Sequence, residues 1–181
     1  MPSDSAAGTA ALSIAKFEKA LHDRSAFSCG FGPIDNFLKS SLADQIKSGM
    51  VTAWVATSRD DPAVLGFYTL SAMAVRAIHG PPKWKRSGIP DIPVIYVRAV
   101  AVRKNMQGKG LGTALLLDAM TRCLNITEQM GAAAIVLDVL EDQNFDQRWK
   151  FYINLGFRSL GDPESPSRVF IPMADVRATL A

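Results

Sequence analysis

A glycine-rich segment at residues 107–112 holds the residues of this chain that are best suited to chemistry. Its sequence is QGKGLG, and it stands between an apolar, β-branched run at residues 94–102 and an apolar stretch from Thr113 that is typical of a helix start. Glycines lack Cβ atoms, and the N–H groups at a helix start have no partner inside the helix and lie at the positive end of its dipole. The pattern therefore predicts a strand, a loop and a helix arranged to hold a phosphate or pyrophosphate group.

The spacing of these residues excludes two common phosphate loops. A P-loop requires Ser or Thr directly after its lysine, whereas Lys109 is followed by Gly110. The dinucleotide fingerprint G-x-G-x-x-G, counted from Gly108, requires a third glycine where the chain has Thr113, and it belongs in a first βα unit rather than past the middle of a chain. The pattern Q-x-x-G-x-G remains, and a tight connection whose glycines serve packing alone is the alternative interpretation.

The composition is that of a globular protein of one domain. The chain has 181 residues, of which 48% are hydrophobic and 20% charged, and its net charge of +3 permits an anionic partner without requiring one. No apolar run reaches the roughly 20 residues of a membrane span, and the N-terminus lacks a secretory signal, so we expect a cytoplasmic protein that does not enter membranes. Cys29 and Cys123 lack metal-ligand spacing, so we expect reduced packing residues and no metal site.

Hydrophobic periodicity and turn residues predict a mixed order of helices and strands. The helix that follows the glycine segment should be closed by Gly131 and should bury Leu115, Leu116, Ala119, Met120 and Cys123. Because this helix joins two strands, those strands should run parallel. The expected elements are a strand or short helix at 12–17, a helix at 33–48, strands at 51–57 and 64–73, a loop at 78–93, a strand at 94–102, a helix from the glycine segment to about 128, a strand at 133–140, a helix at 147–155, and strands at 157–160 and 168–173.

Three stretches carry a resemblance to a known family. Residues 107–112 resemble the acyl-CoA pyrophosphate loop of the GNAT acyltransferase superfamily, and FYINLGF at residues 151–157 resembles its F-Y-x-x-x-G-F segment. HDRSAFSCG at residues 22–30, followed by a Leu-rich helix, resembles the GNAT toxins of bacterial toxin–antitoxin pairs. The resemblance implies the GNAT fold, a mixed α/β structure whose central twisted sheet has splayed parallel strands flanked by helices. It also implies one domain over residues 1–181, with residues 1–10 flexible.

The resemblance further implies an activity. The toxin subgroup uses acetyl-CoA to acetylate the free amino group of aminoacyl-tRNA, which blocks translation, and a ribbon-helix-helix antitoxin holds these toxins inactive. We therefore expect an acetyl-CoA-dependent N-acetyltransferase with an aminoacyl-tRNA acceptor, an antitoxin partner and a homodimeric assembly. Two alternatives stay open: a GNAT enzyme that acetylates a small amine or a protein N-terminus, and a CoA-binding regulatory module without turnover.

By the same resemblance, the donor site lies on the strand and the glycine loop. Pantetheine bonds along the strand edge through the backbone of Val100 and Val102, an N–H near Ala99 or Val100 faces the thioester oxygen, and Lys104 or Lys109 adds charge. Asn144 is a further candidate whose alternative role is a turn or helix cap. The expected cofactor-binding residues are Val100, Ala101, Val102, Gln107, Gly108, Lys109, Gly110, Leu111, Gly112 and Asn144.

Tyr152 is the expected general acid, in the F-Y-x-x-x-G-F segment. A phenol with a pKa near 10 is protonated at neutral pH and can protonate a departing thiolate. The alternative is a core aromatic that packs beside Phe151 and Phe157. No general base stands out among the acidic residues.

Basic residues supply the candidates for contact with tRNA. Lys83, Lys85 and Arg86 surround Trp84, although a run of charges is often only a solvated face. Arg98 stands inside an apolar run, where an arginine is costly unless it is paired or faces a cleft. We expect Arg98 either to face the acceptor site or to bind an acidic partner.

Overall fold

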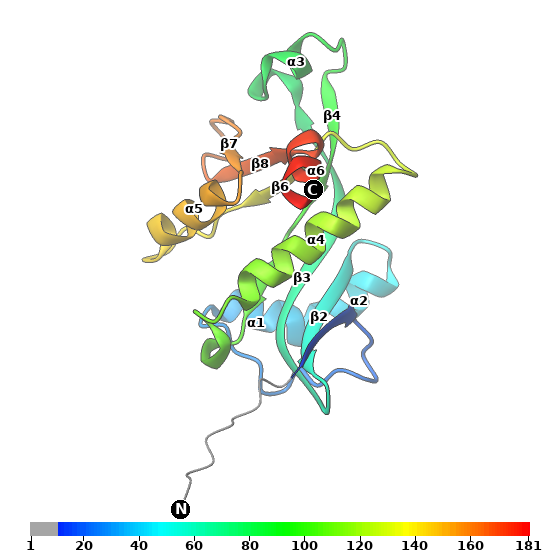
Figure 1. Cartoon of the computed structure of the whole chain (residues 1–181), viewed down its shortest axis with the longest axis vertical. Helices are drawn as coiled ribbons and strands as arrows, with labels where there is room; N and C mark the ends of the chain where they lie inside the picture. The colour runs from blue at the N-terminus through cyan, green and yellow to red at the C-terminus, as the bar shows by residue number, and fades with distance from the viewer. Residues whose placement is uncertain (1–10) are drawn as a thin grey trace, which may run out of the picture.

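One mixed sheet runs through residues 11–181, the part of the chain that the computed structural model describes (Figure 1). The expectation that residues 1–10 are flexible lies outside the described residues. The strand order is β1-β2-β3-β4-β6-β8-β7, and β5 pairs with β3. The strands are β1 (Leu12–Lys16), β2 (Thr52–Ser58), β3 (Asp61–Arg76), β4 (Asp91–Tyr96), β5 (Val100–Val102), β6 (Ala134–Asp138), β7 (Arg158–Ser159) and β8 (Arg168–Pro172).

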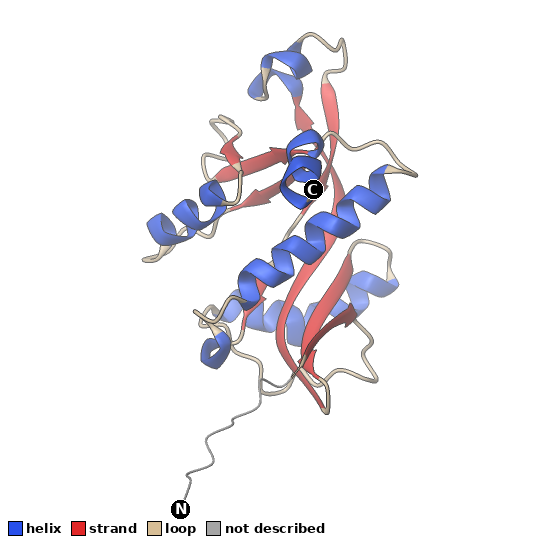
Figure 2. Ribbon diagram, viewed as in Figure 1, coloured by secondary structure: helices blue, strands red, loops and turns tan. Residues whose placement is uncertain are grey.

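Helices cover both faces of this sheet, with α4 on one face and α1 and α2 on the other (Figure 2). The β4 and β6 strands pair in parallel, which confirms the predicted mixed α/β class. The helices are α1 (Gly32–Asn36), a π-helical turn (Phe37–Ser41), α2 (Leu42–Lys47), a 3-10 turn (Ala77–His79), α3 (Pro82–Lys85), a 3-10 turn (Lys104–Met106), α4 (Leu111–Thr127), α5 (Phe145–Asn154) and α6 (Met173–Leu180).

The apolar run at residues 94–102 forms two strands, so the prediction of one strand was wrong. The β4 strand pairs Tyr96 with Ser71, and β5 pairs Val100 with Tyr68. Four steps along β4 and β5 therefore match three steps along β3, which is the extra residue of a β-bulge. A bulge bends the strand and turns it away from its other neighbour, and in the sequence only Arg98 interrupts the apolar run at this point.

The expected loop at residues 78–93 is largely ordered structure. The β3 strand continues to Arg76 because β4 pairs with its second half, and β4 already begins at Asp91. Between them Trp84 anchors α3, since its ring is buried and packs 5.3 Å from the ring centroid of Phe170. Gly80 is required there because a Cβ would lie 2.1 Å from the Trp84 ring.

The predicted helix at residues 33–48 is confirmed as α1, the π-helical turn and α2 in direct succession. Leu38 and Leu42 are fully buried against the face of the sheet that carries Val55 and Phe67. Apolar side chains at every third or fourth position lie on one face of a helix, which accounts for the burial of Leu38 and Leu42.

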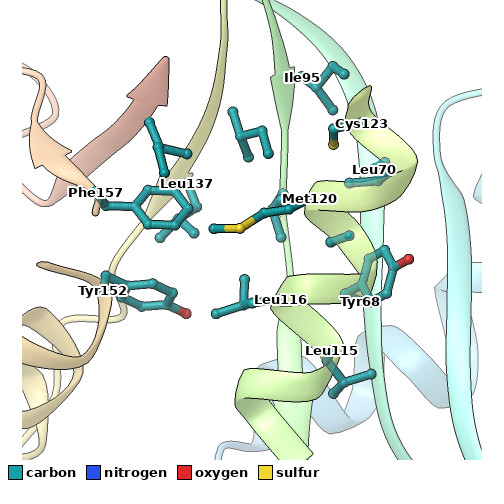
Figure 3. Packing of buried hydrophobic residues seen from close by; sticks show 14 of the residues in the cluster. Tyr68, Leu70, Ile95, Leu115, Leu116, Met120, Cys123, Leu137, Tyr152 and Phe157 are labelled. Atoms are coloured by element: carbon teal, nitrogen blue, oxygen red, sulfur yellow. The ribbon is translucent and has the colours of Figure 1, made fainter. Parts of the chain in front are cut away.

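The helix α4 buries the five side chains that the sequence analysis placed inward, which confirms its inner face (Figure 3). It ends at Thr127, and Gly131 does not adopt the left-handed conformation of a closing glycine, so that part of the prediction was wrong. Gly156 does adopt it, with φ +98°, one residue beyond the C-cap Leu155 of α5. The sequence analysis missed α6, which buries Met173 and Val176 against the core that α4 shares.

Leu115→Ala should destabilise the protein by about 2–5 kcal/mol, because Leu115 is fully buried between α4 and β3 and its loss leaves a cavity. Urea denaturation measures the change. Leu21→Ala is the matched control, since Leu21 is 59% exposed and should change stability by less than about 0.5 kcal/mol. Equal changes in the free energy of unfolding for the two substitutions would show that this core does not hold α4, and with it the glycine segment, in place.

Candidate active site

A cleft opens where the parallel strands β4 and β6 separate. Their pairing consists of Ile95 with Ile135 and Tyr96 with Val136, and it ends with a 2.9 Å bond from the Val97 N–H to the Val136 carbonyl oxygen. Beyond this point β5 follows β3, whereas β6 continues beside β8, so the predicted splaying is confirmed. The cleft has a volume of about 320 Å³ and is bounded by β5, the glycine segment, the end of β6 and α5.

The edge of β5 that borders the cleft presents the backbone of Val100 and Val102. The Thr69 N–H donates to the Ala99 carbonyl oxygen at 3.0 Å, so Ala99 and Ala101 turn their polar groups toward β3. Successive residues of a strand turn these groups to opposite sides. Val100 and Val102 therefore turn theirs into the cleft, in the orientation that the sequence analysis expected, whereas Ala101 lines the cleft without offering backbone bonds.

The hydrogen bonds at Ala99 and Val100 also distinguish between the two N–H groups expected to donate to the thioester oxygen. The Ala99 N–H is already engaged, because it donates to Oγ1 of Thr69 at 3.3 Å. The Val100 N–H faces the cleft by the same alternation, and Val100 lines it. Of the two expected donors, Val100 is therefore the one that can meet a substrate.

The glycine segment has the conformation of an anion-binding helix start. Gly108 and Gly110 have φ values of +73° and +85°, in the left-handed region, and Gly110 directly precedes α4. The first bond inside α4 runs from the Ala114 N–H to the Gly110 oxygen, so the N–H groups of residues 111–113 have no acceptor within the helix. The dipole of this 17-residue helix favours a negative group at the same point. Both features fit a diphosphate.

Gly112 keeps the space between β5 and α5 open. A Cβ at this position would lie 3.8 Å from Cγ2 of Val102 and 3.9 Å from Cζ of Phe151. Its conformation needs no glycine, because its φ is not positive. The absence of a side chain at Gly112 therefore leaves the cleft wider between β5 and α5.

Gln107 holds the walls of the cleft together, a role that the sequence analysis missed. Its side-chain amide donates to the carbonyl oxygens of Cys29 and Val102, each at 2.9 Å. Its main-chain N–H donates to the Lys104 oxygen. Because these donors are engaged, the Gln107 side chain fixes the glycine segment against Cys29 and Val102.

The two lysines near the glycine segment differ in their surroundings. The Lys104 side chain extends over Gly30, where a Cβ would lie 3.0 Å from its Cε, and the Lys104 N–H donates to the Ser28 oxygen at 2.9 Å. Lys109 is exposed between Gly108 and Gly110, directly before the start of α4. Lys109 is thus the better placed cation for an anionic ligand.

Gly110→Ala should weaken acetyl-CoA affinity about fivefold or more, measured by calorimetric titration. Nothing lies within 4 Å of a Cβ at this position, so the cost is the roughly 1–2 kcal/mol of left-handed backbone strain, which moves the loop away from its anion-binding conformation. Gly88→Ala is the matched control, because Gly88 has φ +76°, is equally open and lies outside the cleft. An equal loss of affinity in both variants would contradict a role of the glycine segment in binding.

Tyr152 extends from α5 into the base of the cleft. Its ring packs edge-on against Phe151 and Phe157, with centroids 5.3 and 5.7 Å away, and its hydroxyl lies on the side of Leu116 (Figure 3). No hydrogen bond within the described residues reaches this hydroxyl, and no buried polar side-chain atom there lacks a partner, so the hydroxyl keeps contact with the cleft. Burial raises the pKa of Tyr152 to about 12, which keeps it protonated. The ring is thus a core aromatic whose polar end is available.

The start of α5 forms one rim of the cleft. Asn144 lies at the N-cap position without a side-chain capping bond, and its side chain is exposed. The carboxylate of Asp142 accepts the Asn144 N–H at 2.8 Å, which fixes the turn before the helix, and it pairs with Arg148. The Asn144 side chain therefore stays available at the cleft, and Arg148, which the sequence analysis did not single out, lines the cleft while paired with Asp142.

The N-terminal loop forms the opposite wall, which the sequence analysis did not place in the site. Cys29, Phe31 and Ile34 line the cleft there. The carboxylate of Asp35 fixes this loop by accepting the Cys29 N–H at 2.8 Å and the Ser28 hydroxyl at 3.2 Å. The segment HDRSAFSCG was the available signal, since it marked this stretch as unusual without saying what it touches.

Arg98 lies at the mouth of the cleft, between β4 and β5. Its guanidinium donates to Oε1 of Gln45 at 2.9 Å and stands 4.8 Å above the ring of Phe37. Its exposure explains why an arginine is tolerated in the apolar run. No carboxylate of the described residues pairs with it, so its charge is available to a ligand.

Asp138 borders the cleft at the end of β6 but is fully engaged. Arg168 donates to both of its carboxylate oxygens, at 2.7 and 2.9 Å, and the Tyr96 hydroxyl donates at 2.9 Å. Partial burial disfavours the charged form, yet these hydrogen bonds outweigh it and hold the pKa of Asp138 below its usual value. The Arg148 bond likewise lowers the pKa of Asp142. Neither carboxylate is suited to act as a general base.

The basic residues of α3 are not brought to the cleft. Lys83, Lys85 and Arg86 are exposed, but Trp84 between them is buried. The α3 helix lies near the start of β4, whereas the cleft lies at the other end, roughly 20 Å along the strand (Figure 1). Any contact that these residues make with a ligand must involve a molecule much larger than the cleft.

Within residues 11–181, every helix is too short or too polar to cross a membrane. The same residues contain no group of three or more His, Cys, Asp and Glu side chains that could hold a metal ion.

Comparison with known proteins relates this chain to acetyltransferases. Residues 50–159 match the family described as acetyltransferase (GNAT) domain. A probable toxin TacT of Sinorhizobium fredii is 31% identical, with 96% of this chain and 97% of the relative covered. A tRNA-acetylating toxin of Mycobacterium tuberculosis is 32% identical, with 87% of this chain and 90% of the relative covered.

Two solved structures share the fold. The AtaT toxin complexed with acetyl-methionyl-tRNAfMet has a TM-score of 0.84 at 22% identity and covers 94% of this chain and 100% of its own. A Tyr-to-Phe mutant of AtaT, bound to the C-terminus of the antitoxin AtaR and acetyl-CoA, has a TM-score of 0.76 at 24% identity and covers 92% of this chain and 96% of its own. With the family match spanning most of the sheet and the cleft, the chain belongs to the GNAT acetyltransferase family.

Proposed function

We propose that this protein is an acetyl-CoA-dependent N-acetyltransferase that acetylates the α-amino group of aminoacyl-tRNA and thereby blocks translation. The observation that carries the proposal is the meeting of the β5 backbone edge, the glycine segment and the Tyr152 hydroxyl around one cleft. The choice of acceptor is supported by two full-length relatives, one a probable toxin and the other a tRNA-acetylating toxin.

The donor would be held by backbone groups. The N–H groups of residues 108–113 surround the positive end of α4 and suit a diphosphate, with Lys109 beside them. Val100 and Val102 offer the polar edge along which an extended pantetheine chain can bond as an added strand. Asn144 lies on the facing rim. Acetyl-CoA supplies the acetyl thioester at this site.

Two residues would carry the chemistry. Acetyl transfer forms a C–N bond and breaks a C–S bond, so negative charge develops first on the carbonyl oxygen and then on sulfur. The Val100 N–H is placed to stabilise the charge on oxygen. The Tyr152 hydroxyl, protonated because burial raises its pKa to about 12, is placed to protonate the sulfur. The amine must lose a proton, and because Asp138 and Asp142 are held by arginines, we assign its removal to water; solvent then returns a proton to Tyr152.

The acceptor would enter from the side of the N-terminal loop. Phe31 and Ile34 give this wall apolar surface, and Arg98 at the mouth offers a positive charge suited to a phosphate near the amino acid. Lys83, Lys85 and Arg86 would contact a more distant part of the tRNA backbone. Exposed basic side chains both at the cleft and roughly 20 Å away fit the phosphate backbone of tRNA better than a small amine.

Arg98→Ala should lower kcat/KM for aminoacyl-tRNA about tenfold while acetyl-CoA affinity stays unchanged. The loss reflects one charge-assisted phosphate contact, worth roughly 1.5–3 kcal/mol. Arg76→Ala is the control, since Arg76 is an exposed arginine outside the cleft. The contact would be refuted by equal kcat/KM values for the two variants.

The proposal extends to partners and location. The solved AtaT complex contains the C-terminus of its antitoxin AtaR, and we infer that an antitoxin also restrains the present chain. An acceptor made and used in translation places the enzyme in the cytoplasm. We assign these roles to a single domain over residues 1–181.

Mass spectrometry of total tRNA after incubation with the protein and acetyl-CoA tests the proposal. Acetylated aminoacyl-adenosine should appear after nuclease digestion, and it should fall at least tenfold with Tyr152→Phe. Acetylation of a small amine or of protein N-termini, with every charged tRNA unmodified, would overturn the acceptor. Binding of acetyl-CoA with no turnover on any amine would overturn the enzyme and favour a regulatory module.

A further inference from the structure

A threonine hydroxyl lies in the apolar core next to the strand that borders the cleft. Apart from tyrosine, tryptophan and cysteine, Thr69 of β3 is the only buried residue with a polar side chain among residues 11–181, and its exposed fraction is 0%. Its neighbours are apolar, since Phe67 lies two positions earlier on the same face of β3 and Ala53 is its partner on β2. A hydroxyl in such surroundings is costly unless it forms a hydrogen bond.

The hydrogen bond that the Thr69 hydroxyl accepts comes from the bulge between β4 and β5. The Ala99 N–H donates to Oγ1 of Thr69 at 3.3 Å, and the Thr69 N–H donates to the Ala99 oxygen at 3.0 Å. In a regular antiparallel pair, the backbone groups of the two residues would exchange both bonds. The regular pairing of β5 with β3 stops at Val100 and Tyr68, and at the next residue the Thr69 hydroxyl takes the place of the backbone acceptor.

These two bonds fix the orientation of the Val100 N–H. The Ala99 carbonyl and the Val100 N–H belong to one planar trans peptide group, so they point in opposite directions. Because the Ala99 oxygen is held toward β3, the Val100 N–H points to the cleft. The bond to Oγ1 of Thr69 holds the peptide group on the other side of Ala99. Thr69 therefore holds both peptide groups that flank Ala99.

We propose that Thr69 is a positioning residue for acetyl transfer, whose hydroxyl holds Ala99 so that the Val100 N–H meets the oxyanion of the thioester. Thr69 is not among the residues that line the cleft, so it acts through the backbone and not by contact with a substrate. Its hydroxyl also occupies the Ala99 N–H, which leaves Val100 as the donor at this point of the chain. The inference rests on the proposed acetyl transfer and adds the side chain that prepares its oxyanion site.

Thr69→Val tests the hydroxyl, because valine keeps the β-branched shape and lacks the acceptor. It should lower kcat at least tenfold, within the roughly 10²–10³-fold cost of losing an oxyanion donor, while the dissociation constant of acetyl-CoA stays within about twofold. Thr69→Ser keeps the acceptor and should bring kcat back to within about threefold of the native value. Thr52→Val on β2 is the matched control, since its hydroxyl donates to the Leu70 oxygen, also at 3.3 Å, outside the cleft. Its kcat should equal that of the native chain.

A double-mutant cycle with Val100→Pro separates positioning of the N–H from a general loss of stability. The proline variant already lacks the N–H, so adding Thr69→Val should lower its rate by less than about twofold. A threonine that only stabilises the core would lower the rate by the same factor in both backgrounds. That result, or a native kcat in Thr69→Val, would overturn the proposal.

Amide hydrogen exchange, followed by NMR, tests the same geometry without turnover. Saturating acetyl-CoA should slow the exchange of the Val100 and Val102 amides in the native chain. In Thr69→Val the protection of Val100 should fall about tenfold, whereas that of Val102 should stay, because β5 still pairs with β3 at Ala101. Equal protection of Val100 in the two chains would overturn the positioning role. A native chain that binds acetyl-CoA and acetylates no amine would overturn the proposed function instead, and the exchange of Val100 would still decide the role of Thr69.

Discussion

Val100→Pro is expected to lower the rate of acetyl transfer by about 10²–10³-fold, the usual cost of losing one oxyanion donor. Proline removes the N–H that faces the cleft. It leaves the pairing with β3 intact, because Ala99 and Ala101 make those bonds and Val100 does not. Proline also fits an extended strand where its N–H is not part of the ladder. Single-turnover kinetics with saturating acetyl-CoA measures the chemical step directly.

Val100→Ala is the matched control, because it shortens the same side chain and keeps the N–H. It should stay within about threefold of the native rate. Thermal melting of both variants should stay close to the native curve, since neither deletes a bond to β3. If the proline variant reacts as fast as the alanine variant, the oxyanion is stabilised elsewhere and the assignment of Val100 is wrong.

Tyr152→Phe should slow turnover at least tenfold with little effect on folding or on acetyl-CoA affinity. The ring packs against Phe151 and Phe157, and phenylalanine preserves that packing. Only the hydroxyl is lost, and no hydrogen bond within the described residues depends on it. The thiolate must then leave without a protein proton donor.

The pH profile distinguishes a proton donor from a packing residue. Because burial raises the pKa of Tyr152 to about 12, the hydroxyl stays protonated through pH 10. The native rate should therefore show no decline from its deprotonation between pH 7 and 10. Tyr152→Phe should be slower across this range. The ratio of native to variant rate should shrink when the acetyl donor is a thioester of a more acidic thiol, because that thiolate leaves without a proton. Native turnover of the Tyr152→Phe variant at every pH would show that Tyr152 serves only packing in the core.

The sequence predicts most of the fold because its strongest signals are local. The inner face of α4 follows from helical spacing of apolar residues, and the parallel pairing of β4 with β6 follows from the helix between them. The strand–glycine–helix pattern also predicts the anion-binding geometry, since Gly108 and Gly110 occupy left-handed conformations that other residues avoid.

The rest depends on contacts that no local pattern encodes. The bulge at residues 97–99 arises from a register shift against β3, which Arg98 in the apolar run was not enough to predict. Gln107 reaches a carbonyl oxygen 78 positions earlier in the chain, and the wall formed by Cys29 and Phe31 meets the cleft only through the fold. The place of the basic run around Trp84 could not be predicted either, because only the fold shows that a buried tryptophan holds α3 far from the cleft.

The central claim is that the cleft between β5 and α5 holds the acetyl donor, and a crystal structure with saturating acetyl-CoA tests it most directly. The account predicts the diphosphate within about 2.7–3.2 Å of N–H groups between residues 108 and 113. It also predicts pantetheine bonded to the backbone of Val100 and Val102, with the sulfur beside the Tyr152 hydroxyl. An empty cleft, or acetyl-CoA bound elsewhere on the protein, would contradict it.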